Sequence, residues 1–319
     1  SYSTLVISGG TTKTLSANLP ALYGKNTANG IINVQAGIFD LGTYTANRAT
    51  TVSGGQLIVA SGASLRLSGT SNFPLNFLTR TLDVASNVEY YGATQTISAQ
   101  SYGNLVISGT GTKNALTAST VRGNLVINSS ALNTSATVVS HSIAGDIIMN
   151  GGSITGTAAT YVLNGTSAQS LTMMGSIPSL TVNKASGSVS LNSDLTINNT
   201  LTFTKGNIVT GANRVILESG SSVSGASQST GWVEGYMKRH VATGTSVSRS
   251  FAVGSASYYA PVSVQFATVS SAGYAEASTY DNDHSELDYS GIDDAKSVNR
   301  YWLLSNLSVG FTSASATFN

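Results

Sequence analysis

The residues whose types best suit a binding site form an acidic cluster near the C-terminal end of the sequence. Six of the 14 Asp and Glu residues fall between positions 281 and 294. Carboxylates at alternating positions supply the hard oxygen ligands that Ca²⁺ prefers, although the spacing lacks the glycine and the terminal glutamate of an EF-hand loop. The alternative is a solvated acidic loop between strands. The candidate calcium ligands are Asp281, Asp283, Glu286 and Asp288.

The spacing of the acids in the first two thirds of the chain indicates whether this region could be an enzyme. Cleavage of polysaccharides needs paired carboxylates, or a carboxylate beside a basic group, on one face of the protein. No two acids before residue 220 lie closer than six residues, and only Asp194 and Glu218 approach the repeat spacing described below. We therefore predict no catalytic residues and no enzymatic activity. The acids of this region are Asp40, Asp83, Glu89, Asp146, Asp194 and Glu218.

The remaining chemical signals are weak. The three histidines, His141, His240 and His284, are too widely spaced to match a metal-binding motif. The sequence has no Ser/His/Asp signature and no phosphate-binding glycine loop. A net charge of +1 argues against a nucleic-acid partner. We predict no cofactor other than the candidate Ca²⁺.

Composition narrows the fold that must position these residues. Lys, Arg, Asp and Glu make up 9 % of the 319 residues, against about a quarter in an average soluble protein. Their place is taken by 50 Ser, 38 Thr and 33 Gly. Coiled coils and helical bundles need charged residues in quantity, and disordered chains lack the regularly spaced Leu, Ile and Val found here. The composition therefore favours an all-β fold. This fold has no disulfides, because the sequence has no cysteine.

An internal repeat indicates the architecture. The first 13 residues recur at 101–113 with nine identical positions, and the phrase NLVI at 104–107 returns at 124–127. The recurring unit is a short apolar-x-apolar strand followed by a Gly, Asn or Ser turn. Strands this short form a stable sheet only if coils of about 20 residues stack on one another. We therefore predict a right-handed parallel β-helix, or β-solenoid, over residues 1–228.

The low charge is consistent with such stacking. Equivalent positions of successive coils lie directly opposite each other, where like charges repel. Thr is neutral and β-branched, and Asn and Ser can hydrogen-bond along the stack. The scarcity of charge is therefore expected of a solenoid and does not by itself indicate a function.

A second region is predicted over residues 229–319. It holds 13 of the 24 aromatic residues, including both tryptophans, and eight of the 14 acids lie beyond residue 220. Its strands are longer, as in the alternating Val262, Val264 and Phe266. These features favour a β-sandwich-like module. Both ends of the sequence read as strands cut short, so we expect a fragment of a longer protein with this module incomplete at its C-terminal end.

Several phrases resemble those of very large repetitive surface proteins secreted by Bacteroidota. They include VEYYGATQTIS at 88–98, YGNLVISG at 102–109, GIFDLGTY at 37–44, GWVEG at 231–235 and VNRYW at 298–302. The resemblance spans nearly the whole chain, and its motifs are architectural. It implies export by the type IX secretion system and a role in adhesion or gliding, and it implies no catalytic residue.

We therefore expect an extracellular structural or adhesive protein of a bacterial cell surface, in which a stiff solenoid mediates attachment, gliding or assembly. Expected partners are flanking repeats of the same long protein, further copies of this chain and surface glycans. No apolar stretch approaches the roughly 18 residues that a membrane-spanning helix needs. The alternative is a carbohydrate-active β-helix enzyme or a glycan-binding module, which would gather acids and aromatics in one groove.

Overall fold

A computed structural model describes residues 3–22, 30–49, 53–134, 138–291 and 293–319. Its regular structure is made of β-strands, apart from two single 3₁₀ turns, η1 (Leu287–Tyr289) and η2 (Asp294–Lys296). The chain divides into unit 1 (Ser1–Gly165) and unit 2 (Thr166–Asn319). None of the described residues forms a helix long and apolar enough to cross a membrane.

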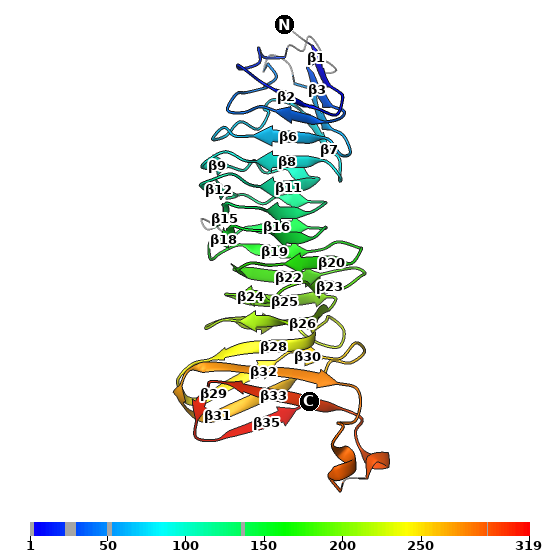
Figure 1. The fold of residues 1–319 in the computed structure, drawn as a ribbon, viewed down its shortest axis with the longest axis vertical. Coiled ribbons are helices and arrows are strands. Elements are labelled where there is room, and N and C mark those ends of the chain that lie inside the picture. The colour runs from blue at the N-terminus through cyan, green and yellow to red at the C-terminus, as the bar shows by residue number, and fades with distance from the viewer. Residues whose placement is uncertain (1–2, 23–29, 50–52, 135–137, 292) are drawn as a thin grey trace. The chain divides into compact units, whose positions relative to one another are not determined.

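Unit 1 is a parallel β-solenoid whose strands, blue to green in Figure 1, stack in four ladders. The first ladder contains β1 (Thr4–Ile7), β3 (Ile31–Val34), β5 (Gln56–Val59) and β7 (Thr79–Leu82). The second contains β2 (Thr12–Thr14), β4 (Ile38–Asp40), β6 (Ser64–Leu67), β8 (Asn87–Tyr90), β11 (Asn104–Ile107), β14 (Leu125–Ile127) and β17 (Ile147–Met149). The third contains β9 (Gln95–Thr96), β12 (Thr112–Asn114), β15 (Ala131–Asn133) and β18 (Ser153–Thr155). The fourth contains β10 (Ser101–Tyr102), β13 (Thr120–Val121), β16 (Ser140–Ile143) and β19 (Thr160–Leu163).

The interior of unit 1 is a column of apolar side chains from equivalent positions of successive coils. In the second ladder, Val88 pairs with Leu105, Leu105 with Leu125, and Leu125 with Ile147. All four side chains are buried. Alternate residues of a strand point to opposite faces, so the apolar-x-apolar pattern places its two apolar residues inward. The predicted parallel β-solenoid is confirmed.

Polar side chains on the same strands bond from one coil to the next. Asn104 donates from Nδ2 to Oδ1 of Asn87 at 3.1 Å, and its own Oδ1 accepts the backbone N–H of Asn124 at 2.7 Å. Asn124 in turn accepts the backbone N–H of Asp146 at 2.8 Å. The last two bonds join residues 20 and 22 apart in sequence, which is one coil. These bonds are the stacking role that the Asn and Ser content predicts.

Unit 2 begins with further parallel coils. One ladder contains β20 (Gln169–Thr172), β23 (Val189–Leu191), β26 (Ile208–Leu217) and β28 (Val233–Val241), and β21 (Ser176–Ile177) and β24 (Leu195–Ile197) join it through β26. Another contains β22 (Ser179–Asn183), β25 (Thr200–Lys205) and β27 (Ser222–Ser224). Parallel pairing thus continues past residue 228, the last residue of the predicted solenoid, through β28 to β30 (Val253–Gly254).

The rest of unit 2 is antiparallel. β28 pairs with β32 (Gly273–Tyr280), and β32 pairs with β33 (Tyr301–Leu307). A separate sheet joins β29 (Gly244–Phe251) and β31 (Val262–Ser271) to β34 (Gly310–Phe311) and β35 (Ala314–Phe318). These longer strands occur where the sequence predicts a β-sandwich-like module. That module and the boundary at 228/229 stay predictions.

Candidate functional site

Three of the four candidate calcium ligands, Asp281, Asp283 and Glu286, have described side chains. Asp281 is ion-paired with Arg300, and Asp283 accepts a hydrogen bond from Ser297. The Glu286 side chain is exposed, and the side chain of Asp288 lies outside the described residues. No group of three or more His, Asp or Glu side chains that could hold a metal is found among the described residues. The calcium site stays a prediction.

Two solenoid acids that are far apart in sequence meet the same arginine. Arg66 donates from Nε to Glu89 at 2.7 Å, and its Nη1 lies 3.5 Å from Asp40. The three residues occupy one position of three successive coils, so charges of alternating sign lie opposite each other. Burial lowers the pKa of Arg66, but the hydrogen bond and charge of Glu89 and the charge of Asp40 outweigh it and raise that pKa.

Neighbouring side chains make further contacts with Arg66, Asp40 and Glu89. Tyr91 donates to Asp40 at 2.8 Å and lies under the Arg66 guanidinium, 4.2 Å from its ring centroid. Ser108 donates to Glu89 at 2.6 Å. A permanently charged arginine between two carboxylates offsets part of their negative charge and supplies no proton-transfer group. We interpret the cluster as a stacking element of unit 1.

Asp194 and Glu218, the two acids whose sequence spacing approaches one coil, have separate partners. Asp194 accepts the backbone N–H of Arg214, and Glu218 accepts the hydroxyl of Tyr274.

Two lysines are buried in the coils and donate hydrogen bonds to backbone and side-chain oxygens. Lys113 donates from Nζ to the carbonyl oxygens of Gly92, Ala93 and Thr110 at 2.7 to 2.8 Å and to the Ser130 hydroxyl at 3.2 Å. Burial lowers the pKa of Lys113. In unit 2, Lys184 donates to the Ser167 carbonyl and to Oε1 of Gln169. Each ammonium group therefore links a coil to turns of neighbouring coils.

The outward face of β26, β28 and β32 carries a network of aromatic and charged residues. Arg214 donates from Nε to Glu276 at 2.6 Å and lies over the Tyr236 ring. The Tyr236 hydroxyl lies 2.9 Å from that of Tyr280, whose ring stacks on Tyr301 with centroids 4.9 Å apart. Lys238 lies over the ring of Tyr274 at 4.4 Å.

A groove opens at one end of this face. Its volume is about 350 Å³, and its lining includes Val209, Gly211, Glu234, Tyr236, Tyr280 and Asp281. Glu234 has no hydrogen bond or ion pair to its carboxylate within the described residues, and burial raises the pKa of Glu234. The groove thus has two acids and two tyrosines among its lining residues.

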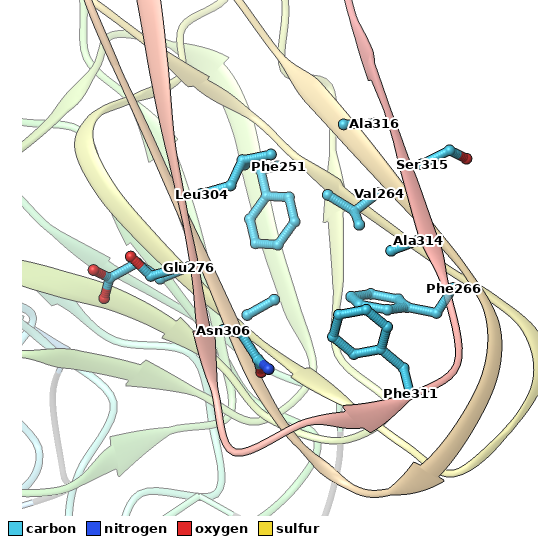
Figure 2. A pocket seen from close by; sticks show the side chains of 12 residues that line it. Phe251, Val264, Phe266, Glu276, Leu304, Asn306, Phe311, Ala314, Ser315 and Ala316 are labelled. Atoms are coloured by element: carbon cyan, nitrogen blue, oxygen red, sulfur yellow. The ribbon is translucent and has the colours of Figure 1, made fainter. Parts of the chain in front are cut away.

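A second hollow, of about 250 Å³, lies between β31 and β35 on one side and β33 on the other. Figure 2 shows Phe251, Val264, Phe266 and Phe311 directed into it, whereas the Glu276 carboxylate points away. Its lining is mainly apolar, with Ser305, Asn306 and Ser315 as the uncharged polar members.

Sequence reasoning missed the groove. Glu234 is the only acid of the phrase GWVEG, and it lies 47 positions before Asp281, so no spacing motif links the two. The signals that could have found it are the aromatic enrichment after residue 228 and a lone glutamate between glycine and valine. No protein-family model, no curated protein and no solved structure matches this chain.

Proposed function

We propose that this chain is a structural and adhesive protein of a bacterial cell surface, whose stacked coils act as a stiff spacer. The observation that carries the proposal is the use of polar side chains for bonds between coils. Asn87, Asn104 and Asn124 form one such series, and Asn114 and Asn133 another at 2.8 Å. Side chains committed to stacking stiffen the coils and leave few groups for chemistry on them.

Other features support an extracellular surface role. The phrases that resemble those of large secreted Bacteroidota proteins support export by the type IX system as part of this proposal. Repeating coils can continue into flanking repeats of the same protein or associate with further copies. Among the described residues, β1 and β2 each pair on one side only, with β3 and β4, so the first coil presents strand edges for such contacts.

Attachment of coated particles under flow tests the adhesive role. Polystyrene beads carrying the purified chain are passed over glass and over surfaces bearing bacterial glycans, with albumin-coated beads as the control. We expect retention of the coated beads at shear that removes the control beads. Retention equal to that of albumin on every surface would contradict the proposal.

A carbohydrate-active enzyme is the second candidate. The observation that favours it is the presence of Glu234 and Asp281 in the lining of one groove, since glycoside hydrolysis uses two carboxylates. Incubation with a panel of polysaccharides, followed by assays of reducing ends and unsaturated products, distinguishes it. Product formation that is lost in Glu234→Gln supports the enzyme, and no product from any polysaccharide refutes it.

A further inference from the structure

We propose that the groove around Glu234 in unit 2 binds a neutral oligosaccharide through hydrogen bonds to its hydroxyl groups and contact with tyrosine rings. The inference rests on the proposed adhesive function, because it names the ligand class through which attachment would occur.

The groove has the size and the walls of a ligand site. Three parallel neighbours, Val209, Glu234 and Gly254, form its base. Tyr236 and Tyr280 line it from β28 and β32. Its volume of about 350 Å³ falls within the range of about 300 to 1,000 Å³ typical of small-molecule sites.

The charge of the groove favours a neutral ligand rich in hydroxyls. Asp281 is neutralised by Arg300, which leaves Glu234 as the carboxylate without a partner. An unpaired, partly buried carboxylate accepts hydrogen bonds from hydroxyl groups and repels an anionic sugar. The Arg214 guanidinium near Tyr236 is already paired with Glu276, so it does not offset this preference.

The aromatic side chains supply the apolar part of sugar recognition. The Tyr236 and Tyr280 hydroxyls are 2.9 Å apart, and Tyr280 is stacked on Tyr301 with an interplanar angle of 16°. Contacts on both sides hold Tyr280 in place, so little side-chain entropy remains to be lost on binding. Tyrosine combines an apolar ring with a polar hydroxyl, which matches the C–H faces and hydroxyls of a pyranose.

A third hollow, distinct from the one in Figure 2, extends the groove. It has a volume of about 310 Å³, shares Val209 and Glu234 with the first, and includes Asn207, Thr230 and Trp232 in its lining. Glu234 thus lies where the two hollows meet. A ligand that uses both must be longer than one sugar ring, which is why we infer an oligosaccharide.

The backbone around Glu234 is shaped by irregularities in β26 and β28. The register of β26 against β28 shifts between Val209 and Arg214, so that residues 210–213 bulge from the sheet. Thr210 Oγ1 accepts the backbone N–H of Tyr236 at 3.1 Å, and Gly235 adopts a φ of +117°, which favours glycine. Trp232 donates from Nε1 to the Ser255 carbonyl at 2.8 Å and fixes the turn after β30. Bulges of this kind re-aim side chains next to functional sites.

The test is binding of the intact chain to an array of neutral and anionic oligosaccharides, followed by calorimetry with the best neutral binder. Glu234→Gln and Tyr280→Ala are the groove variants, and Glu89→Gln and Tyr289→Ala are matched controls on unit 1 and on an exposed turn. We expect affinity to fall about 10-fold or more in each groove variant, because each loses a charge-assisted hydrogen bond or a ring contact. The controls should bind like the wild type, and circular dichroism with thermal melting shows whether each variant is folded.

Three outcomes would overturn the proposal. They are the absence of binding to any neutral oligosaccharide at millimolar concentration, binding to anionic oligosaccharides alone, and full affinity in both folded groove variants. Bead attachment separates this result from the broader proposal. If coated beads are retained on bare glass but no saccharide binds, the oligosaccharide proposal is wrong and the adhesive function is supported. If a saccharide binds but no surface retains the beads, the adhesive function is wrong and the oligosaccharide proposal is supported.

Discussion

The coils of unit 1 and the strands β28 and β32 of unit 2 use their few charged and polar groups in opposite ways. In the coils, Lys113 is fully buried and bonded to backbone carbonyls, and Arg66 is held between Asp40 and Glu89. On β28 and β32, polar groups share an open face with tyrosines, and Glu234 has no partner in the described chain. The difference teaches that a low content of charge can serve stability in one region and recognition in another.

The largest expected effect is a loss of stability when Lys113, the buried lysine of the coils, is replaced. Replacing it with Met should lower the free energy of unfolding by about 3 kcal/mol, because three buried carbonyl oxygens lose their donor. Urea unfolding followed by circular dichroism measures the change. Lys13, at the equivalent position of the repeat, is exposed, so Lys13→Met should change stability by less than about 0.5 kcal/mol. Equal effects of the two substitutions would contradict the role of Lys113.

A smaller effect should follow from breaking the asparagine series. Asn104→Ala removes a bond to Asn87 and leaves the backbone N–H of Asn124 without its acceptor. We expect a loss of about 1.5 kcal/mol in the same unfolding assay. Asn150→Ala, which removes a single exposed bond to Asn128, should cost about 0.5 kcal/mol or less. If Asn104→Ala proved the milder change, stacking through asparagine would not be a main source of coil stability.

Alkaline pH should destabilise unit 1 through its buried tyrosines. Burial raises the pKa of Tyr90 to about 12, with Tyr102 as its hydrogen-bond partner. The unfolded chain loses the proton near pH 10 and the folded chain does not, so stability present below pH 10 is lost as pH rises. The contribution lost by pH 11 is about 1.4 kcal/mol. Tyr90→Phe should flatten the fall in stability between pH 9 and pH 11, whereas Tyr289→Phe, at an exposed site, should leave the slope unchanged.

Acid should act on unit 1 through His141. Burial lowers its pKa, and its ring packs beside Tyr161 with centroids 5.6 Å apart. The unfolded chain therefore binds a proton below pH 6.5 more readily than the folded chain, and stability falls as pH drops. We therefore expect the free energy of unfolding to fall between pH 7 and pH 5.5. Urea titrations at both pH values should show a smaller loss for His141→Phe, and an unchanged loss would exclude this histidine as the cause.

The smallest effect is expected in unit 2, at the pair of Arg214 and Glu276. The arginine side chain is 39 % exposed, so solvent screens the interaction. Glu276→Gln should lower the free energy of unfolding by about 0.5 kcal/mol, as measured by thermal melting. A loss of stability as large as that of Lys113→Met would show that charged groups stabilise both regions equally, and would contradict the comparison.

Much of the coil architecture could be predicted from the sequence, because coil spacing and inward apolar positions are local and repeated. The repeat did not predict that Lys113 is buried while Lys13 is exposed. β12 has paired strands on both sides, β9 and β15, whereas β2 pairs with β4 alone among the described residues. Burial of a repeated residue therefore depends on its neighbours in the stack.

The groove could not be predicted in the same way. It depends on the bulge at 210–213 and on the pairing that brings Tyr280 beside Tyr236. These features join segments about 70 residues apart, and single-sequence patterns do not record such contacts. Composition alone reveals the acidic cluster at 281–294. It does not reveal Glu234, the carboxylate of the groove, because a single acid leaves no compositional signal.

Hydrogen–deuterium exchange of the intact chain, with and without a saturating neutral oligosaccharide from the array, tests the central claim most directly. That claim is that recognition resides in unit 2 near Glu234 and that the polar groups of the coils serve stacking. We predict slower exchange at residues 209–211, 234–236, 254–256 and 279–281, with no change in residues 30–134. Slower exchange in those coils, with none around Glu234, would contradict the claim.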